Sequence, residues 1–207
     1  MQLDSTVLAA YESWCTASVN DPDPGFWGHW PRYYAEMPVK QDWVQAAAKR
    51  CQTAVVVIGR SAGEDRENTL KKGSFYLTNK EKALLDAVTA AFQKVVLVLN
   101  IGSIMDFAEI HAYGDKISAI LLAWQLGMES GNAVADVLTG QVNPSGRLTD
   151  TIAKTYADYP AQNFGNKAEN HYTEDIFVAI GILRPLRRSG CCTPLVTVCL
   201  TRTLPVR

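Results

Sequence analysis

Three short runs of β-branched and aliphatic residues constrain the fold of this 207-residue chain more than any other feature. They are TAVVVI at Thr53–Ile58, VVLVLN at Val95–Asn100 and ISAILLAW at Ile117–Trp124. Runs of this kind, without regular polar alternation, are typical of strands that a parallel sheet buries on both faces. Helix-like segments separate them, so the sequence predicts an α/β domain, a three-layer sandwich with a mainly parallel sheet.

The segments around these runs have the residues of helices. Val39–Arg50 carries its apolar residues on one face and contains good helix formers. Asn79–Gln93 can begin at Thr78 or Asn79 as the N-cap, with Glu81 in the first turn, where a negative charge favours the helix dipole. We expect three shorter helices at Asp4–Cys15, Met105–His111 and Gly131–Leu138.

Composition divides the chain into three parts. We expect a helix and an aromatic loop at 1–37, an α/β sandwich domain at 38–178, and a separate tail at 179–207. The formal net charge of −1 hides this division, because five arginines and no acidic residue follow Asp175. The 20 basic groups therefore split into 15 and 5, and residues 1–175, with all 21 acidic groups, carry a net charge of −6.

Charge and composition exclude several classes of protein. The body has no basic surplus, so we expect no nucleic-acid partner. The apolar runs are far shorter than the roughly 20 residues of a membrane span, so we expect no membrane partner. The three histidines and five cysteines lack metal-ligand or disulfide-framework spacing, and we expect no metal and no cofactor. The first residues lack a signal peptide's pattern, which favours a reducing, cytoplasmic compartment.

Aromatic residues are concentrated in the Pro- and Gly-rich segment Asn20–Tyr34, which we expect to be a loop. Two interpretations stay open. The rings could line a sugar site by stacking, or they could simply attach the loop to the body of the domain. The residues concerned are Phe26, Trp27, Trp30, Tyr33 and Tyr34.

Polar loops follow the three predicted strands, at the sheet edge where α/β proteins place their functional residues. The longest of them, after the first strand, contains Glu64, Asp65, Arg66, Glu67 and Asn68. A carboxylate on such a loop could act as a general acid if its pKa were raised. The alternative is an exposed, solvated run of charges. The glycine-rich fingerprint of a nucleotide site is absent, which disfavours a nucleotide-binding protein.

Longer motifs on these loops resemble a known family. VVVIGRSAGEDREN followed by KGSFYLT, then VVLVLNIGS, WQLGMESGNAVADVLTGQVNPSGRL and YTEDIFV are similar to the C-terminal sandwich domain of glycoside hydrolase family 3, the β-glucosidases. The similarity runs over roughly Met37–Val178. It implies a two-domain enzyme that hydrolyses terminal β-D-glucosyl residues with retention. In such an enzyme a barrel domain, which this chain lacks, supplies the nucleophilic aspartate, and the sandwich supplies the acid/base glutamate.

The resemblance places the acid/base on Glu64, since alignment through KGSFYL brings Gly73 to the family's offset. Two residues depart from the family's GEGxDR pattern: Asp65 replaces a glycine, and Glu67 and Asn68 stand where Asp and Arg are expected. Asp65, Arg66 and Glu67 are then candidates for substrate binding or for tuning the pKa of the acid. We expect the chain to be an incomplete, inactive half of an active site. A non-catalytic carbohydrate-binding or regulatory module on the same sandwich is the alternative.

The tail does not follow the family. After YTEDIFV the family continues with GYRYF and later LYPFGYGLSYT, whereas this chain has AIGIL and later CCTPLVTVCLTR. Both of its segments can be written in codons that spell the family motifs once a single nucleotide is restored. We therefore infer that a nucleotide was lost near Val178–Ala179, and that residues 179–207 are an out-of-frame, disordered tail with no fitted packing.

Overall fold

The computed structural model describes residues 2–17, 31–61, 68–146, 148, 152–159, 168–172 and 191–193. These residues form two compact units. The first contains the described residues of 2–105 and 113–142, and the second those of 106–112 and 143–193. Nothing in the described part is a helix long and apolar enough to cross a membrane.

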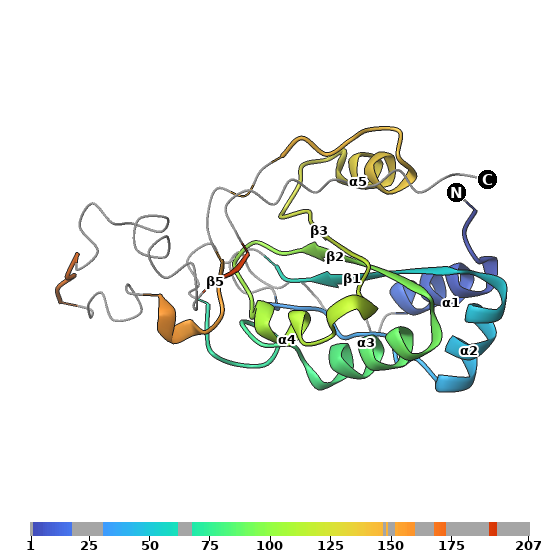
Figure 1. The fold of residues 1–207 in the computed structure, drawn as a ribbon, viewed down its shortest axis with the longest axis horizontal. Helices are drawn as coiled ribbons and strands as arrows, with labels where there is room; N and C mark the ends of the chain where they lie inside the picture. The colour runs from blue at the N-terminus through green and yellow to red at the C-terminus, as the bar shows by residue number, and fades with distance from the viewer. Residues whose placement is uncertain are drawn as a thin grey trace. The chain divides into compact units, whose positions relative to one another are not determined.

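A three-stranded parallel sheet forms the centre of the first unit (Figure 1). Its strands are β1 (Thr53–Gly59), β2 (Lys94–Asn100) and β3 (Ala119–Leu122), in the order β1-β2-β3. All pairs are parallel, with Val56 opposite Leu97 and Leu97 opposite Ile120. The predicted α/β sandwich with a parallel sheet is confirmed, and each apolar run contains a strand of this sheet.

The third strand is shorter than the run that predicts it. Sheet-like hydrogen bonds continue one residue beyond each end, from the Ser118 N–H to the Val95 carbonyl and from the Ala123 N–H to the Leu99 carbonyl. Trp124 then adopts a φ of 55°, in the left-handed region, and this ends the extended chain. Such a conformation costs about 1–2 kcal/mol for a residue with a side chain.

Helices α2 (Gln41–Arg50) and α3 (Asn79–Ala91) supply the helical side of the core, and they contact each other. α3 also contacts β1 and β2. The alternation along β1 buries Val56 and Ile58 while Val55 and Val57 point to the exposed face. The buried apolar side chains of the helices are Val44 and Ala47 of α2 and Leu85 and Val88 of α3.

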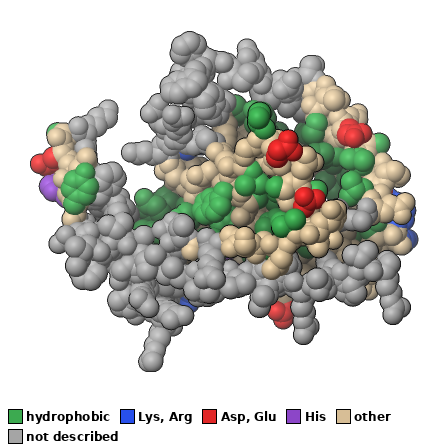
Figure 2. Space-filling view, turned by 90° about the horizontal axis from the view of Figure 1, so that it is seen from above, with side chains coloured by type: hydrophobic (Ala, Val, Ile, Leu, Met, Phe, Trp, Pro, Cys, Tyr) green, Lys and Arg blue, Asp and Glu red, His purple; other side chains and the backbone are tan. Residues whose placement is uncertain are grey.

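Part of the first unit's surface is apolar and uncovered. α1 (Ser5–Thr16) and α5 (Ser130–Thr139) have no buried residue, although both contain several apolar side chains. Around α5, Leu126 is 45%, Met128 103% and Val142 51% exposed. Figure 2 shows several groups of hydrophobic side chains, with acidic groups among them, on the face that it draws. Patches of this kind mark surfaces that bind a partner.

The remaining elements are short. The first unit also contains the 3-10 turn η1 (Gly114–Lys116). The second unit contains α4 (Phe107–His111), η2 (Tyr156–Asp158) and an antiparallel pair of β4 (Ile152–Ala153) with β5 (Cys191–Thr193). β5 is the described part of the predicted tail; residues 179–190 and 194–207 lie outside the described residues.

Candidate functional site

The four charged residues that the sequence singles out are on the loop after β1. Glu64, Asp65, Arg66 and Glu67 fall within residues 62–67, which lie outside the described part of the chain. The structure does describe both flanks of this segment, hereafter the acidic loop. It leaves from Ser61, at the carboxyl end of the parallel sheet, and returns at Asn68.

A buried ion pair supports the flank before the acidic loop. Arg60 immediately follows β1 and is only 6% exposed, and Glu81 on α3 is 1% exposed. The Arg60 Nη1 donates to the Glu81 Oε1 at 2.5 Å and the Nη2 to the Oε2 at 2.9 Å, so the pair is bidentate. Nε and Nη1 also donate to the carbonyls of Ser74 and Gly59, at 3.2 and 2.8 Å. Such geometry suits a planar guanidinium in a dry environment.

The start of α3 explains why a glutamate is buried there. Thr78 is the N-cap, and its hydroxyl accepts a hydrogen bond from the Glu81 N–H at 3.1 Å. In return the Glu81 carboxylate accepts from the Thr78 N–H at 2.6 Å, which completes a capping box. The T-x-x-E spacing in the sequence signals this box. It does not signal Arg60, which sequence reasoning missed as the partner of Glu81.

The same residues hold the flank after the acidic loop. The Ser74 hydroxyl donates to the Asn68 Oδ1, and the Asn68 Nδ2 donates to the Ile104 carbonyl at 2.6 Å. Because Arg60 donates to the Ser74 carbonyl, one chain of hydrogen bonds joins the two flanks. On the first flank the Ser61 N–H also donates to the Arg32 carbonyl at 2.8 Å. The acidic loop is therefore anchored at both of its ends.

The last residue of the second strand and a residue after the third strand contact this flank. The Arg60 N–H donates to the carbonyl of Asn100, the last residue of β2, at 2.9 Å. Gln125, next to the strained Trp124, donates from Nε2 to the Arg60 carbonyl at 3.1 Å. A Cβ on Gly102 would lie 2.9 Å from the Gln125 amide, so a larger residue there would displace the end of that side chain. Backbone strain of this kind is concentrated at functional sites.

A cavity of about 550 Å³ opens beside these strand ends and is hereafter the edge cavity. It is lined by residues of the strand ends, by Tyr11 and Trp14 of α1, and by the segment Tyr33–Met37. The strand-end residues are Val57, Gly59, Arg60, Ser61, Asn100 and Gln125. Tyr33 and Tyr34 are the two members of the predicted aromatic cluster that the structure describes, and both line the cavity. Phe26, Trp27 and Trp30 lie outside the described residues.

Glu36 is the titratable group with the largest change in this cavity. Burial raises its pKa to about 7, and the Glu81 carboxylate acts in the same direction. Arg60 and Lys80 oppose the rise. Sequence reasoning gave no signal for Glu36, because no motif or periodicity surrounds it.

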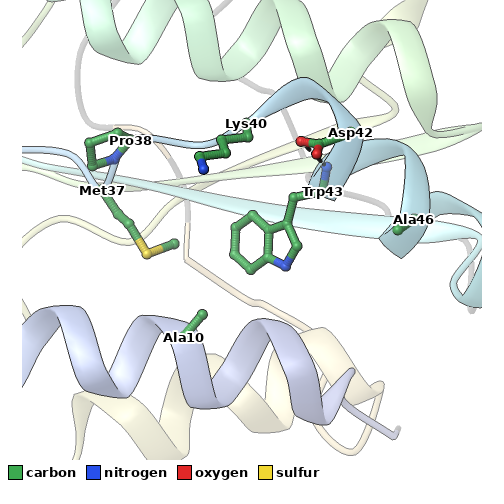
Figure 3. Close-up of a pocket in the computed structure, with 7 residues that line it drawn as sticks. All are labelled: Ala10, Met37, Pro38, Lys40, Asp42, Trp43 and Ala46. Atoms are coloured by element: carbon green, nitrogen blue, oxygen red, sulfur yellow. Dashed lines mark hydrogen bonds between the residues drawn. The ribbon is translucent and has the colours of Figure 1, made fainter.

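A second hollow, of about 470 Å³, lies between α1 and the start of α2 (Figure 3). Met37 and Trp43 extend toward α1, where Ala10 faces them, while the Asp42 carboxylate accepts a hydrogen bond from the Trp43 N–H at 2.9 Å. No group of three or more His, Cys, Asp or Glu side chains that could hold a metal ion occurs among the residues described.

Comparison with known proteins gives a consistent result. A model of the glycosyl hydrolase family 3 C-terminal domain matches residues 8–180. The chain is 42% identical over 178 residues to a β-glucosidase of Ruminococcus albus, covering 86% of this chain and 18% of that enzyme. It is 36% identical over 172 residues to β-glucosidase A of Butyrivibrio fibrisolvens, covering 72% of this chain and 21% of that enzyme.

Solved structures agree with the sequence matches. A crystal structure of a β-glucosidase from Paenibacillus barengoltzii has a TM-score of 0.86 and 36% identity, covering 94% of this chain and 21% of that one. β-Glucosidase 3B of Thermotoga neapolitana, in complex with glycerol, has a TM-score of 0.74 and 31% identity, covering 90% of this chain and 27% of that one. This chain thus spans about a fifth to a quarter of these relatives.

Proposed function

Because the chain belongs to glycosyl hydrolase family 3 and corresponds to its C-terminal domain, we propose that it forms one side of the active site of a retaining β-glucosidase. The substrate class is a terminal β-D-glucoside or a short oligosaccharide that ends in one. The family-model match over residues 8–180, together with 42% identity to a β-glucosidase over 178 residues, carries this proposal, since the matched range includes the acidic loop and both of its anchored flanks.

In this proposal Glu64 is the acid/base. Retaining glycosidases use two carboxyl groups about 5–5.5 Å apart, one as the nucleophile and the other as the acid. Glu64 donates a proton to the glycosidic oxygen as the leaving group departs, and its carboxylate then activates the water that releases glucose. The nucleophile belongs to a barrel domain, and no carboxylate of this chain is assigned that role.

The residues next to Glu64 in the sequence are of the kind that raises the pKa of a catalytic acid. A carboxyl that must hold its proton near neutral pH needs a raised pKa, and nearby negative charge supplies it. Asp65 and Glu67 are such charges in the sequence. Arg66 has the opposite effect on the pKa and is the better candidate for hydrogen bonds to substrate hydroxyls.

The apolar surface around α5 supports a docking role toward the barrel domain. α5 has no buried residue, and Leu126, Met128 and Val142 beside it are 45%, 103% and 51% exposed. Relatives about three to five times as long as this chain have room for such a domain. Without it the chain lacks the nucleophile, and we expect no measurable turnover from the isolated protein.

The experiment has two parts. The isolated chain is first assayed on cellobiose and on aryl β-glucosides. Residues 8–178 then replace the matching segment of the Ruminococcus albus enzyme, and kcat/KM is measured with and without Glu64→Gln. Loss of a general acid lowers the rate about 10²–10⁴-fold. We expect that loss on cellobiose and a much smaller one on a dinitrophenyl glucoside, whose leaving group needs no proton.

Neighbouring residues provide the controls. Asp65→Asn and Glu67→Gln should shift the pH profile of kcat/KM while retaining most of the activity on both substrates. If Glu64→Gln reduces kcat/KM equally on both substrates, or leaves both unchanged, Glu64 is not the acid. Strong turnover by the isolated chain would refute the need for a barrel domain.

A further inference from the structure

We propose that Asn68 and Ser74 are positioning residues for the acid/base Glu64, because they fix the point at which the acidic loop returns. We base this on the proposed function, since the two side chains have such a role only if Glu64 is the acid. The two residues and Arg60, which binds the Ser74 carbonyl, are hereafter the Asn68 clamp. All three lie in the first unit.

The side-chain amide of Asn68 has partners on both its nitrogen and its oxygen, although the residue is exposed. Its Nδ2 donates to the Ile104 carbonyl at 2.6 Å. Its Oδ1 accepts from the Thr69 N–H at 3.1 Å and from the Ser74 hydroxyl. The same Thr69 N–H also donates to the Ser74 Oγ at 3.0 Å. Because an amide held at both of these atoms cannot rotate freely, Asn68 keeps one place relative to Ile104 and Ser74.

The groups that bind Asn68 are connected to the core. Ser74 is 7% exposed, and its carbonyl accepts a hydrogen bond from the Arg60 Nε at 3.2 Å. Arg60 is 6% exposed and makes the buried ion pair described above. Ile104 precedes Met105, which is 1% exposed. The clamp therefore joins the first residue after the acidic loop to two buried parts of the first unit.

Chain length makes the ends of the acidic loop important for Glu64, which follows Ser61 by three residues and precedes Asn68 by four. A residue spans at most about 3.3–3.6 Å, so the Glu64 Cα lies within about 11 Å of the first end and about 14 Å of the second. An acid must come within hydrogen-bond distance of the glycosidic oxygen, and an error of about 1 Å in such a placement can lower the rate about 100-fold. Release of either end should therefore slow proton transfer.

The residue type at position 68 is necessary for these contacts. Asn68 stands at one of the departures from the GEGxDR pattern, where an arginine is expected. An arginine side chain has only donors, so it could not accept the hydrogen bonds that Asn68 accepts from Thr69 and Ser74. The Asn68 clamp is therefore a feature of this chain and does not follow from the family pattern.

The kinetic test uses the hybrid enzyme described above with Asn68→Ala. Ser74→Ala is the second variant, which also serves if Asn68→Ala fails to fold by circular dichroism. The substrates are cellobiose, whose leaving group needs a proton, and a dinitrophenyl glucoside, whose leaving group does not. We expect kcat/KM on cellobiose to fall about 10–100-fold, and kcat/KM on the dinitrophenyl glucoside to change by less than about threefold. A role in folding alone would lower both values by the same factor.

Asn79→Ala is the matched control. Asn79 is another exposed asparagine with a hydrogen-bonded side chain, because its Oδ1 accepts from the Lys72 Nζ at 2.6 Å, but it lies at the start of α3. The control should leave kcat/KM unchanged on both substrates. The double variant Asn68→Ala/Glu64→Gln should be no slower on cellobiose than Glu64→Gln alone, because the placement of an acid has no effect once the acid is absent.

Amide exchange in the full 207-residue chain adds a measurement that needs no turnover. We expect the Thr69 N–H to exchange about tenfold faster in Asn68→Ala, while the amides of β2 stay protected. Unchanged exchange at Thr69 would show that the clamp does not form in solution. A difference between the two substrates in Glu64→Gln, but in neither clamp variant, would overturn the positioning role alone. No difference in Glu64→Gln would overturn the proposed function, and the positioning role with it.

Discussion

Glu36 is a partly buried carboxyl in a cavity that is also lined by Arg60, the buried ion-pair partner of Glu81. Burial raises its pKa to about 7, the Glu81 carboxylate of α3 adds to the rise, and Arg60 and Lys80 oppose it. Burial raises the pKa of the Tyr11 phenol on α1, and the Cys15 and Glu36 side chains add to the rise. A residue with these neighbours makes the stability of the folded state depend on pH.

The direction of this dependence follows from the two protonation equilibria of Glu36. Below about pH 4.5 this carboxyl is protonated in both the folded and the unfolded chain, so its ionisation does not change the free energy of unfolding. Between about 4.5 and 7 the unfolded chain loses its proton first, which favours unfolding, and the penalty is complete above 7. Glu36→Gln removes it. Because solvent screens a partly exposed group, we expect this variant to raise Tm by only about 2–4 °C at pH 8.

Thermal unfolding at pH 4.5 and pH 8 checks this prediction. At pH 4.5 Glu36→Gln should match the wild-type Tm, and Glu12→Gln, on an exposed position of α1, should leave Tm unchanged at both pH values. An equal stabilisation at both pH values would show that the variant acts through packing or polarity and not through ionisation.

At the scale of elements, α3 combines a capping box with a buried ion pair on one glutamate. Glu81→Gln keeps an amide oxygen for the Thr78 N–H, since glutamine also serves in a capping box, but it leaves the Arg60 charge without compensation. Removing one partner of a buried pair costs about 3–5 kcal/mol. Thr78→Ala removes the helix cap but keeps the Arg60–Glu81 ion pair, and should lower the free energy of unfolding by about 1 kcal/mol.

Denaturant unfolding of the two variants distinguishes the roles. We expect Glu81→Gln to lower the free energy of unfolding by several times the effect of Thr78→Ala. If Thr78→Ala is equally costly, the cap and not the ion pair holds α3 against the sheet. The double variant Arg60→Met/Glu81→Leu should recover much of the loss, because it removes both charges from the interior.

The elements were largely predictable and their contacts were not. The strands follow from local runs such as Thr53–Ile58, and the helices from local periodicity, so each predicted element is present with ends shifted by a few residues. The ends shift because caps and strain decide them, as at Trp124. The Arg60–Glu81 pair joins residues 21 positions apart across a loop, and no local pattern indicates that such a pair forms.

At the scale of the whole molecule, the edge cavity gathers side chains from positions 11 to 125. Sequence reasoning identified Tyr33 and Tyr34 as possible sugar contacts because aromatic clusters are visible locally. It could not find Asn100, which lines the same cavity only through the topology of the sheet, or Glu36, which follows the tyrosines in the sequence but belongs to no motif. The acidic loop is the converse case: its residues are evident from the sequence, and they lie outside the residues that the structure describes.

The last feature at this scale is the C-terminal tail, residues 179–207, and its contribution to stability. We propose that residues 179–207 are read out of frame, a proposal that the family match supports by ending at residue 180. Its described contacts are the pairing of Cys191–Thr193 with the two residues of β4 and the packing of the same strand on α4. Two-stranded pairings are marginal in stability on their own. The tail should therefore contribute little to the free energy of folding.

Three chains test this: the present one, a truncation after Val178, and one whose gene has the missing nucleotide restored. Because only a fitted segment can bury apolar surface usefully, we expect the truncated chain to keep Tm within about 2 °C of the present one, and the restored chain to exceed both by about 4 °C or more. The melting curves should also steepen in the restored chain, since more surface unfolds cooperatively. A truncation that lowers Tm by more than about 4 °C would show that the present tail packs as a selected part of the fold.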